Sequence, residues 1–133
     1  CEFVRAVKDA VGDRLVLAAQ VTDNSVPRIL ENMGRMKDAG ADIGVIAAPY
    51  FLVNATDENV RHLYVEAIRQ SPMPVGIYDR GQRGTTAVSR EVLADVYGQE
   101  DVVLAKDSSD DEERMRVACE VQSNRPELCS PFH

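Results

Sequence analysis

The sequence predicts an α/β fold built on a parallel sheet, because short apolar runs alternate with segments of helical periodicity along the whole chain. The apolar runs begin about every 30 residues, which is the length of one strand, one helix and their connections. The chain has 44% hydrophobic and 28% charged residues, a balance typical of a globular domain rather than a disordered chain. We therefore expect consecutive βα units joined by right-handed crossovers.

Five apolar runs are candidates for the strands, and turn-forming or polar residues bound each of them. They are Arg14 to Gln20, Ile43 to Ala48, Pro74 to Asp79, Val102 to Lys106 and, less distinctly, Glu127 to Ser130.

The helices are recognised by their ends and by an apolar stripe. Three of them follow a Ser or Thr that can cap the first turn, at Ser25, Thr56 and Ser89. Ser109 and Glu112 have the spacing of a capping box and predict the start of a last helix. Residues 2 to 11 are typical of the end of an earlier helix, so one helix precedes the first strand.

Charge and cysteine content exclude several classes of protein. The net charge of −7, without a basic run, argues against nucleic-acid binding. The longest apolar stretches contain Gly and Pro and are too short to span a bilayer, and no signal peptide opens the chain, so we expect a soluble, cytoplasmic protein. Cys1, Cys119 and Cys129 lack metal-binding spacing and are expected to be free, packed thiols.

The pattern of βα units fits two architectures, a closed (βα)8 barrel and an open doubly wound sheet. A (βα)8 barrel needs roughly 250 residues, so about five strands would be a little over half of one. A doubly wound domain fits the length, but it usually opens with a strand, whereas this chain starts within a helix at Cys1. We therefore expect the sequence to be part of a longer chain.

Candidate functional residues lie where the predicted strands end, because parallel α/β folds bind ligands at the carboxyl ends of their strands. Lys106 directly follows an apolar strand, and a neutral lysine amine in such a place is a nucleophile for a carbonyl group. Strand alternation puts Tyr78 and Lys106 on one side of the sheet and Asp107 on the helix side. Arg83 is a candidate cation for a substrate carboxylate. A lysine that ends a strand is also typical of a surface residue or an ion-pair partner.

Four segments resemble, in order and spacing, the dihydrodipicolinate synthase and N-acetylneuraminate lyase family. They are AGAD at 39 to 42, APYF at 48 to 51, GIYDRGQRG at 76 to 84 and LAKDSSDD at 104 to 111. The resemblance implies a (βα)8 barrel, of which this chain covers about five βα units, from strand 3 to strand 7. Residues 1 to 133 are then part of a single barrel domain, and the protein is expected to be a homo-oligomer, a tetramer or a dimer.

The resemblance also implies a chemistry for the site residues. Lys106 matches the lysine that forms a Schiff base with pyruvate or a related 2-oxo acid, and Tyr78 matches the residue that moves the proton. Arg83 matches the arginine that steers a substrate carboxylate, and Tyr50 is a further candidate for substrate binding. The implied protein is a class I aldolase, lyase or synthase that joins or cleaves a 2-oxo acid and an aldehyde, with no metal or organic cofactor.

Two departures from the family pattern affect these expectations. Synthases often carry a second tyrosine at the place of Phe51, which has no hydroxyl for a proton relay. Arg80, Gly81 and Gln82 replace the usual V-P-[GS], so the pocket for the second substrate is expected to differ. One alternative is a non-catalytic or truncated relative that binds a small carboxylate. Another is a doubly wound domain that binds a phosphorylated ligand.

Overall fold

The computed structural model describes residues 1–52, 55–83 and 86–129. Within these ranges, four strands form one sheet in the order β1-β2-β3-β4, and each pairs in parallel with the next strand along the chain. The strands are β1 (Ala18–Gln20), β2 (Ile43–Ala47), β3 (Val75–Asp79) and β4 (Val102–Asp107). The parallel βα order predicted from the sequence is therefore confirmed.

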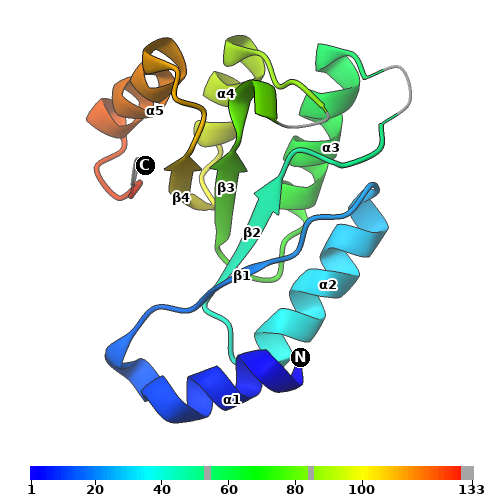
Figure 1. Cartoon of the computed structure of the whole chain (residues 1–133), viewed down its shortest axis with the longest axis vertical. Coiled ribbons are helices and arrows are strands. Elements are labelled where there is room, and N and C mark those ends of the chain that lie inside the picture. Colours follow the sequence, from blue (N-terminus) through cyan, green and yellow to red (C-terminus); the bar gives the residue numbers. More distant parts are fainter. Residues whose placement is uncertain (53–54, 84–85, 130–133) are drawn as a thin grey trace.

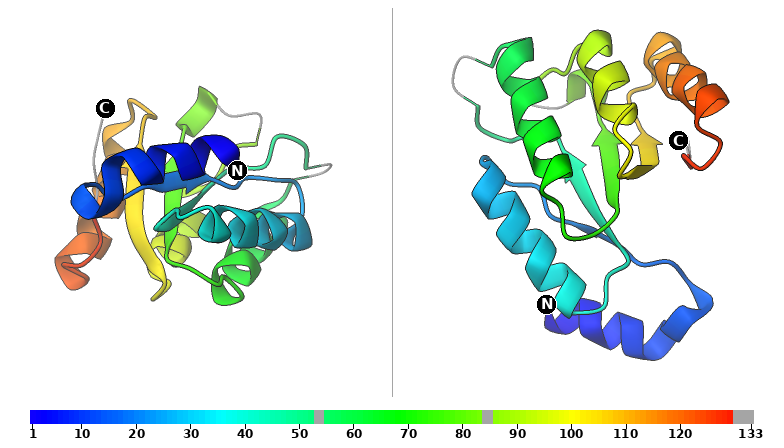
Figure 2. Two further views of the ribbon diagram at one scale, coloured as in Figure 1. Left: turned by 90° about the horizontal axis from the view of Figure 1, so that it is seen from below. Right: turned by 180° about the vertical axis from the view of Figure 1, so that it is seen from behind.

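Four helices cover one face of this sheet and follow the order of the strands. They are α2 (Val26–Asp38), α3 (Asp57–Arg69), α4 (Arg90–Tyr97) and α5 (Glu112–Asn124). They lie behind the strands in Figure 1 and in front of them in the view from behind in Figure 2. The first helix, α1 (Glu2–Val11), lies at the end of the sheet where the strands begin (Figure 1). No helix in the described ranges has the length and apolar character needed to cross a membrane.

The hydrophobic core fills the space between the helices and one face of the sheet. Its fully buried side chains come from strands and helices alike, among them Ile29, Met33, Ile46, Tyr64, Ile68, Val75, Ile77, Leu93 and Tyr97. The apolar residues that recur with helical periodicity in the sequence are the ones that pack in this core.

The opposite face of the sheet is only partly covered. Ile43, Val45 and Leu104 are half-buried there, and they pack around Gly76. A Cβ atom at Gly76 would lie 3.2 Å from the side chains of Leu104 and Val45, so glycine leaves the room in which these residues meet across three strands. Tyr78 lies two residues beyond Gly76 and therefore faces the same side.

The first strand is shorter than the sequence predicts. The run from Arg14 was expected to be extended throughout, but Gly12–Arg14 forms a short 3-10 turn, and the strand itself is Ala18–Gln20. Leu15 and Val16 are 62% and 72% exposed. An apolar run forms a strand only where a neighbouring strand pairs with it. In the described ranges, pairing between β1 and β2 begins with Ala18 opposite Ile43, so Leu15 and Val16 lie before the paired part.

A side-chain anchor joins the entry of β1 to that of β2. The backbone N–H of Leu17 donates to Asp42 Oδ2 at 2.8 Å, and Lys8 Nζ of α1 lies 3.1 Å from the same carboxylate. The hydrogen bond from Leu17, and then the contact with Lys8, lower the pKa of Asp42 below its usual value. This carboxylate therefore ties α1 to the sheet.

Three further local predictions are resolved by the structure. Thr56 and Ser89 cap α3 and α4 as predicted, accepting hydrogen bonds from the N–H groups of Asn59 and Val92. The prediction for α5 was wrong, because Asp111 caps this helix, whereas the Ser109 hydroxyl donates to Asp107 Oδ1.

The predicted fifth strand and the predicted packing of the thiols fare differently. The weak apolar run near the end is represented by a parallel bridge between Leu104 and Cys129, while Ser130 lies outside the described residues. The expectation of packed thiols was wrong, because Cys1, Cys119 and Cys129 are all exposed. Cys119 lies on α5 beyond the edge of the helix face that reaches the core, whose buried members are Arg114 and Ala118.

Candidate active site

Lys106 and Tyr78 lie side by side at the carboxyl ends of β4 and β3. They are register partners in the parallel ladder, so their side chains leave the sheet on the same face. The Lys106 Nζ atom lies 4.3 Å from the centre of the Tyr78 ring, and both residues are half-buried. The structure thus brings together the amine and the phenol that the sequence singled out.

The loop after β4 adds a hydroxyl to this pair. Lys106 Nζ donates to Ser108 Oγ at 3.5 Å, and the backbone N–H of Ser108 donates to the carbonyl of Asp79 at 3.0 Å. The Asp107 carboxylate accepts from the backbone N–H and the hydroxyl of Ser109 at 2.7 and 2.6 Å. These bonds fold the loop back over the strand ends and hold Ser108 beside the amine.

The residues that follow Tyr78 and Lys106 point to the helix side and are buried, at 4% exposed for Asp79 and 2% for Asp107. Arg114 of α5 forms a two-pronged ion pair with Asp79, with Nε to Oδ2 at 2.7 Å and a second nitrogen to Oδ1 at 2.9 Å. The remaining nitrogen of Arg114 donates to the carbonyl of Val88 at 2.7 Å. The ion pair therefore ties the end of β3 to α5 and to the start of α4.

Burial and charge act together on the groups behind the strand ends. Burial by itself would lower the pKa of Arg114, but the hydrogen bonds and charge of Asp79 outweigh it and raise that pKa above its usual value. Burial, followed by the charges of Asp79 and Asp107, raises the pKa of Tyr97. Within the described part of the chain, neither Tyr97 OH nor Asp107 Oδ2 has a hydrogen-bond partner. This cluster is consequently a neutral phenol beside a fixed ion pair.

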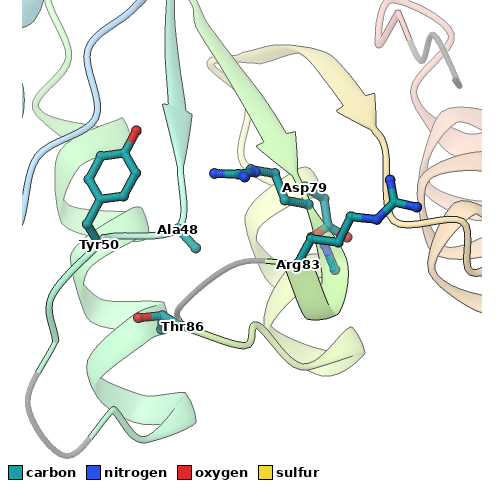
Figure 3. Close-up of a pocket in the computed structure, with 7 residues that line it drawn as sticks. Ala48, Tyr50, Asp79, Arg83 and Thr86 are labelled. Atoms are coloured by element: carbon teal, nitrogen blue, oxygen red, sulfur yellow. The ribbon is translucent and has the colours of Figure 1, made fainter.

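A small pocket opens at the ends of β2 and β3. We call it the Arg80 pocket. It has a volume of about 120 Å³ and is lined by Ala48, Tyr50, Asp79, Arg80, Gly81, Arg83 and Thr86. Figure 3 shows Tyr50 on one side of this space, Thr86 on another, and Asp79 with Arg83 opposite. Thr86 donates its hydroxyl to the carbonyl of Pro49 at 2.9 Å, which joins the two loops that form the walls.

Two other predicted site residues, Tyr50 and Arg83, line this pocket from opposite sides. The Tyr50 hydroxyl accepts a hydrogen bond from Gln20 Nε2 at 3.2 Å, and its side chain is 50% exposed. Arg83 forms an ion pair with Asp110 and lies 3.4 Å from the carbonyl of Ser108. Its side chain runs away from Tyr50 in Figure 3. The structure therefore places Arg83 at the pocket with its guanidinium turned to the loop after β4.

Sequence reasoning did not identify Arg114 or Thr86. A signal for Arg114 was present, because it falls on the same helical stripe as Ala118 and Val121, and a charged residue on a buried stripe predicts a buried partner. Arg80 was noted as part of the loop that departs from the family pattern, and the structure places it at the wall of this pocket. Among the described residues, no group of His, Cys, Asp or Glu side chains is arranged to hold a metal ion.

Comparison with known sequences gives one consistent result. A sequence profile of the dihydrodipicolinate synthetase family matches residues 1–128. The 4-hydroxy-tetrahydrodipicolinate synthases of Acidothermus cellulolyticus and Kineococcus radiotolerans are each 31% identical to this chain over 109 residues, which is 82% of this chain and 35% of the relative. The chain thus spans about a third of the length of these curated relatives.

Comparison with solved structures agrees on the fold. Dihydrodipicolinate synthase from Thermotoga maritima superimposes with a TM-score of 0.86 at 16% identity, covering 98% of this chain and 45% of that one. A prophage protein of the dihydrodipicolinic acid synthase family from E. coli K12, solved in complex with pyruvate, gives 0.83 at 16% identity, covering 98% and 44%. A structure described as the first monomeric dihydrodipicolinate synthase variant also gives 0.86 at 16% identity, covering 98% and 44%.

These structures are (βα)8 barrels, so the parallel sheet described above is a consecutive part of such a barrel. The barrel expected from the sequence is confirmed, and the doubly wound alternative is not. On the match over residues 1–128, this chain belongs to the dihydrodipicolinate synthetase family.

Proposed function

We propose that the protein is a class I aldolase, lyase or synthase that forms a Schiff base with pyruvate or a related 2-oxo acid and makes or breaks a C–C bond. The observation that carries the proposal is the contact between Lys106 Nζ and the Tyr78 ring at the carboxyl edge of the sheet. Membership of the family supports it, as does the pyruvate bound by the related prophage protein of E. coli K12.

The chemistry begins with the neutral amine of Lys106. Its lone pair attacks the ketone carbon of the 2-oxo acid, and the ketone oxygen takes up a proton to give a carbinolamine. Loss of that oxygen as water leaves an iminium ion. The iminium withdraws electrons from the neighbouring carbon, which loses a proton and becomes an enamine nucleophile for an aldehyde. In the cleavage direction the same steps run in reverse, and hydrolysis of the iminium returns the free lysine.

Each step needs a group that gives or takes a proton, and we assign this role to Tyr78. Its ring lies beside the amine, so its hydroxyl belongs to the same small space at the strand ends. Ser108 Oγ, at 3.5 Å from Lys106 Nζ, orients the amine. Arg83 and Tyr50 are proposed to bind substrate at the Arg80 pocket, which both residues line.

The proposal extends to the rest of the protein. Residues 1 to 133 are assigned to a single barrel domain of a cytoplasmic homo-oligomer, a tetramer or a dimer. Its partners are small molecules, a 2-oxo acid and an aldehyde, and the mechanism uses no cofactor.

Trapping of the Schiff base tests the proposal directly. The chain contains three lysines, Lys8, Lys37 and Lys106, so a peptide map can assign any adduct without ambiguity. The protein is incubated with pyruvate and borohydride, and intact and peptide masses are compared with a sample treated without pyruvate. We expect one reduced pyruvyl group, on Lys106. Circular dichroism of the same sample establishes that the chain is folded.

Matched variants separate chemistry from general reactivity. Lys106→Met keeps the length of the side chain and should abolish the adduct. Lys37→Met removes an exposed lysine of α2 and should leave the adduct unchanged. Tyr78→Phe should slow adduct formation by about a hundredfold or more, the usual contribution of a positioned acid or base.

The alternative is a family member that binds a small carboxylate without reacting, and Phe51 favours it. This side chain is 78% exposed and has no hydroxyl where synthases often carry a second tyrosine. A folded protein that binds pyruvate but yields no adduct on Lys106 would contradict the aldolase proposal and support this alternative.

A further inference from the structure

Gln20 places a polar side chain in an apolar row on the open face of the sheet. It pairs with Val45 in the ladder, and Val45 pairs with Gly76, so all three lie on the face that carries Tyr78. The next member of the row is Leu104 of β4. Gln20 is exposed, and the Schiff-base mechanism assigns it no role. An exposed amide among apolar neighbours, at the carboxyl end of a strand, is a candidate for ligand binding.

Two hydrogen bonds fix the orientation of the Gln20 amide. Its Nε2 atom donates to Thr22 Oγ1 at 3.3 Å and to the Tyr50 hydroxyl at 3.2 Å. Thr22 is itself held in place, because its Oγ1 atom accepts the backbone N–H of Ala47 at 2.8 Å. In the part of the chain that the structure describes, the Oε1 atom of Gln20 accepts no hydrogen bond. Because a primary amide has two N–H hydrogens and both are engaged, Oε1 remains as an acceptor in a fixed position.

A row of residues across the open face connects this amide to the candidate amine. Thr22 is bonded to Ala47, which pairs with Tyr78 of the next strand. Neighbouring strands lie about 4.8 Å apart, so Thr22 and Tyr78 are on the order of 10 Å apart. The Lys106 Nζ atom lies over the Tyr78 ring, 4.3 Å from its centre. The Gln20 amide and the Lys106 amine are therefore also separated by on the order of 10 Å on one face of the sheet.

This separation matches the length of an aldol product attached to Lys106. Three bonds of an extended chain span roughly 3.5 Å, and a hydrogen bond to Oε1 takes up about 2.8 Å. About 7 Å therefore remain, which is the length of roughly six bonds counted from Nζ. With pyruvate as carbons 1 to 3 and the former aldehyde carbon as carbon 4, these bonds end at an oxygen on carbon 5 or carbon 6. The oxygen that reaches Gln20 thus lies on the first or second carbon beyond the aldehyde carbon.

The group that meets Gln20 must donate a hydrogen bond and carry no charge. An amide oxygen only accepts hydrogen bonds, so a carboxylate is excluded. A cation is disfavoured, because Gln20, Thr22 and Tyr50 offer it no carboxylate. A hydroxyl group satisfies both conditions.

We propose that Gln20 is a specificity-determining residue, whose Oε1 atom accepts a hydrogen bond from a hydroxyl group on the second substrate. This hydroxyl lies one or two carbons beyond the aldehyde carbon, so the substrate is a short hydroxyaldehyde. The C–C bond forms between the enamine carbon and the aldehyde carbon, whose oxygen takes up a proton. The inference names the substrate class of the proposed aldolase and rests on that function. Because Gln20 is exposed, water replaces a missing partner, and the hydroxyl should therefore improve binding by about tenfold.

Binding of two unreactive acids tests this contact without any chemistry. The acids are 5-hydroxypentanoate and pentanoate, which differ by one hydroxyl group on carbon 5, and binding is followed by NMR at the backbone amide of Gly76. We expect a Kd about tenfold lower for 5-hydroxypentanoate. Gln20→Met keeps the length of the side chain without the amide and should remove this preference. Gln70→Met makes the same change at the exposed glutamine that ends α3 and should retain it.

Selectivity in the reaction gives a second test. Addition of pyruvate to 2-hydroxypropanal is compared with addition to propanal, and the ratio of the two kcat/KM values should fall about tenfold in Gln20→Met. Each aldehyde keeps its own reactivity on every variant, so a change in the ratio reports the contact and a general loss of activity cancels. Gln20→Asn, whose amide is one methylene shorter, should lose the preference too and serves as the test variant if Gln20→Met does not fold.

The two proposals fail in different ways. Equal binding of the two acids by the wild type, or a preference that survives in Gln20→Met, would overturn the role of Gln20. If no adduct forms on Lys106 and neither aldehyde reacts, the aldolase proposal fails, and the binding of the two acids still decides whether Gln20 recognises a hydroxyl group. If the adduct forms and the ratio of rates is the same in the wild type and in Gln20→Met, the aldolase proposal stands and the inference about Gln20 is refuted.

Discussion

Replacement of Arg114 by methionine tests whether the buried ion pair supports the candidate site. Methionine keeps the apolar stem of the side chain but removes all three hydrogen bonds, two to Asp79 and one to the carbonyl of Val88. The side chains of Arg114 and Asp79 are 7% and 3% exposed, so water does not replace the lost partner. Among the described residues, the Asp79 carboxylate then keeps only the hydrogen bond from the N–H of Gly81.

The expected loss follows from this burial. Removal of one partner from a buried ion pair costs about 3–5 kcal/mol, because the other charge stays buried without compensation. A domain has a free energy of unfolding of about 5–15 kcal/mol, so the variant should lose a large fraction of it. The double variant Asp79→Leu with Arg114→Met removes both charges and should be destabilised by less than the sum of the two single variants.

Urea unfolding of the full chain, followed by circular dichroism, measures these differences. A double-mutant cycle of wild type, the two single variants and the double variant gives the coupling energy between Asp79 and Arg114. We expect about 2 kcal/mol or more, within the range measured for residues in one buried network. A loss below about 1 kcal/mol in Arg114→Met, or additive single effects, would refute the role assigned to this pair.

Two other positions give separate predictions. Gly81→Ala should cost about 1–3 kcal/mol, because φ is +54° and the new methyl group would meet Ser109, and a lower Tm in thermal unfolding would show it. Asp42→Asn should destabilise the chain at neutral pH, because the folded state holds the pKa of Asp42 below its usual value. That stabilisation is present above the unfolded pKa of about 4 and is lost as pH falls below it. The unfolding free energies of wild type and Asp42→Asn should therefore converge in acid. A difference between these two free energies that stays constant from pH 7 to pH 3 would contradict this.

Strands and helices with a regular pattern of apolar residues were predicted well from the sequence. The strands β2, β3 and β4 lie within one residue of their apolar runs, and the predicted first helix matches α1. In these segments periodicity, caps and turn residues agree. The exposed Leu15 and Val16 show the limit of this reasoning, because their apolar side chains lack a neighbouring strand. Pairing is a property of the whole sheet, and local pattern does not contain it.

The sequence predicts those parts of the candidate site that depend only on a residue's position along a strand. Strand alternation and the ends of parallel strands were sufficient to bring Tyr78 and Lys106 together. Partner choice among charged side chains was not predicted. Substrate binding by Arg83 stays a prediction, but its ion pair with Asp110, a residue with a φ of 58° in the loop after β4, was not predicted. Such ion pairs depend on loop conformations and on competition among several charged partners, and local sequence pattern predicts neither.

The two strand ends share one construction. Each carries a candidate site residue toward the open face and, at the next residue, a buried carboxylate toward the helices, Tyr78 before Asp79 and Lys106 before Asp107. The carboxylates fix the loops through Gly81 and Ser109, so the positions of Tyr78 and Lys106 on the open face are held by hydrogen bonds on the helix side of the sheet.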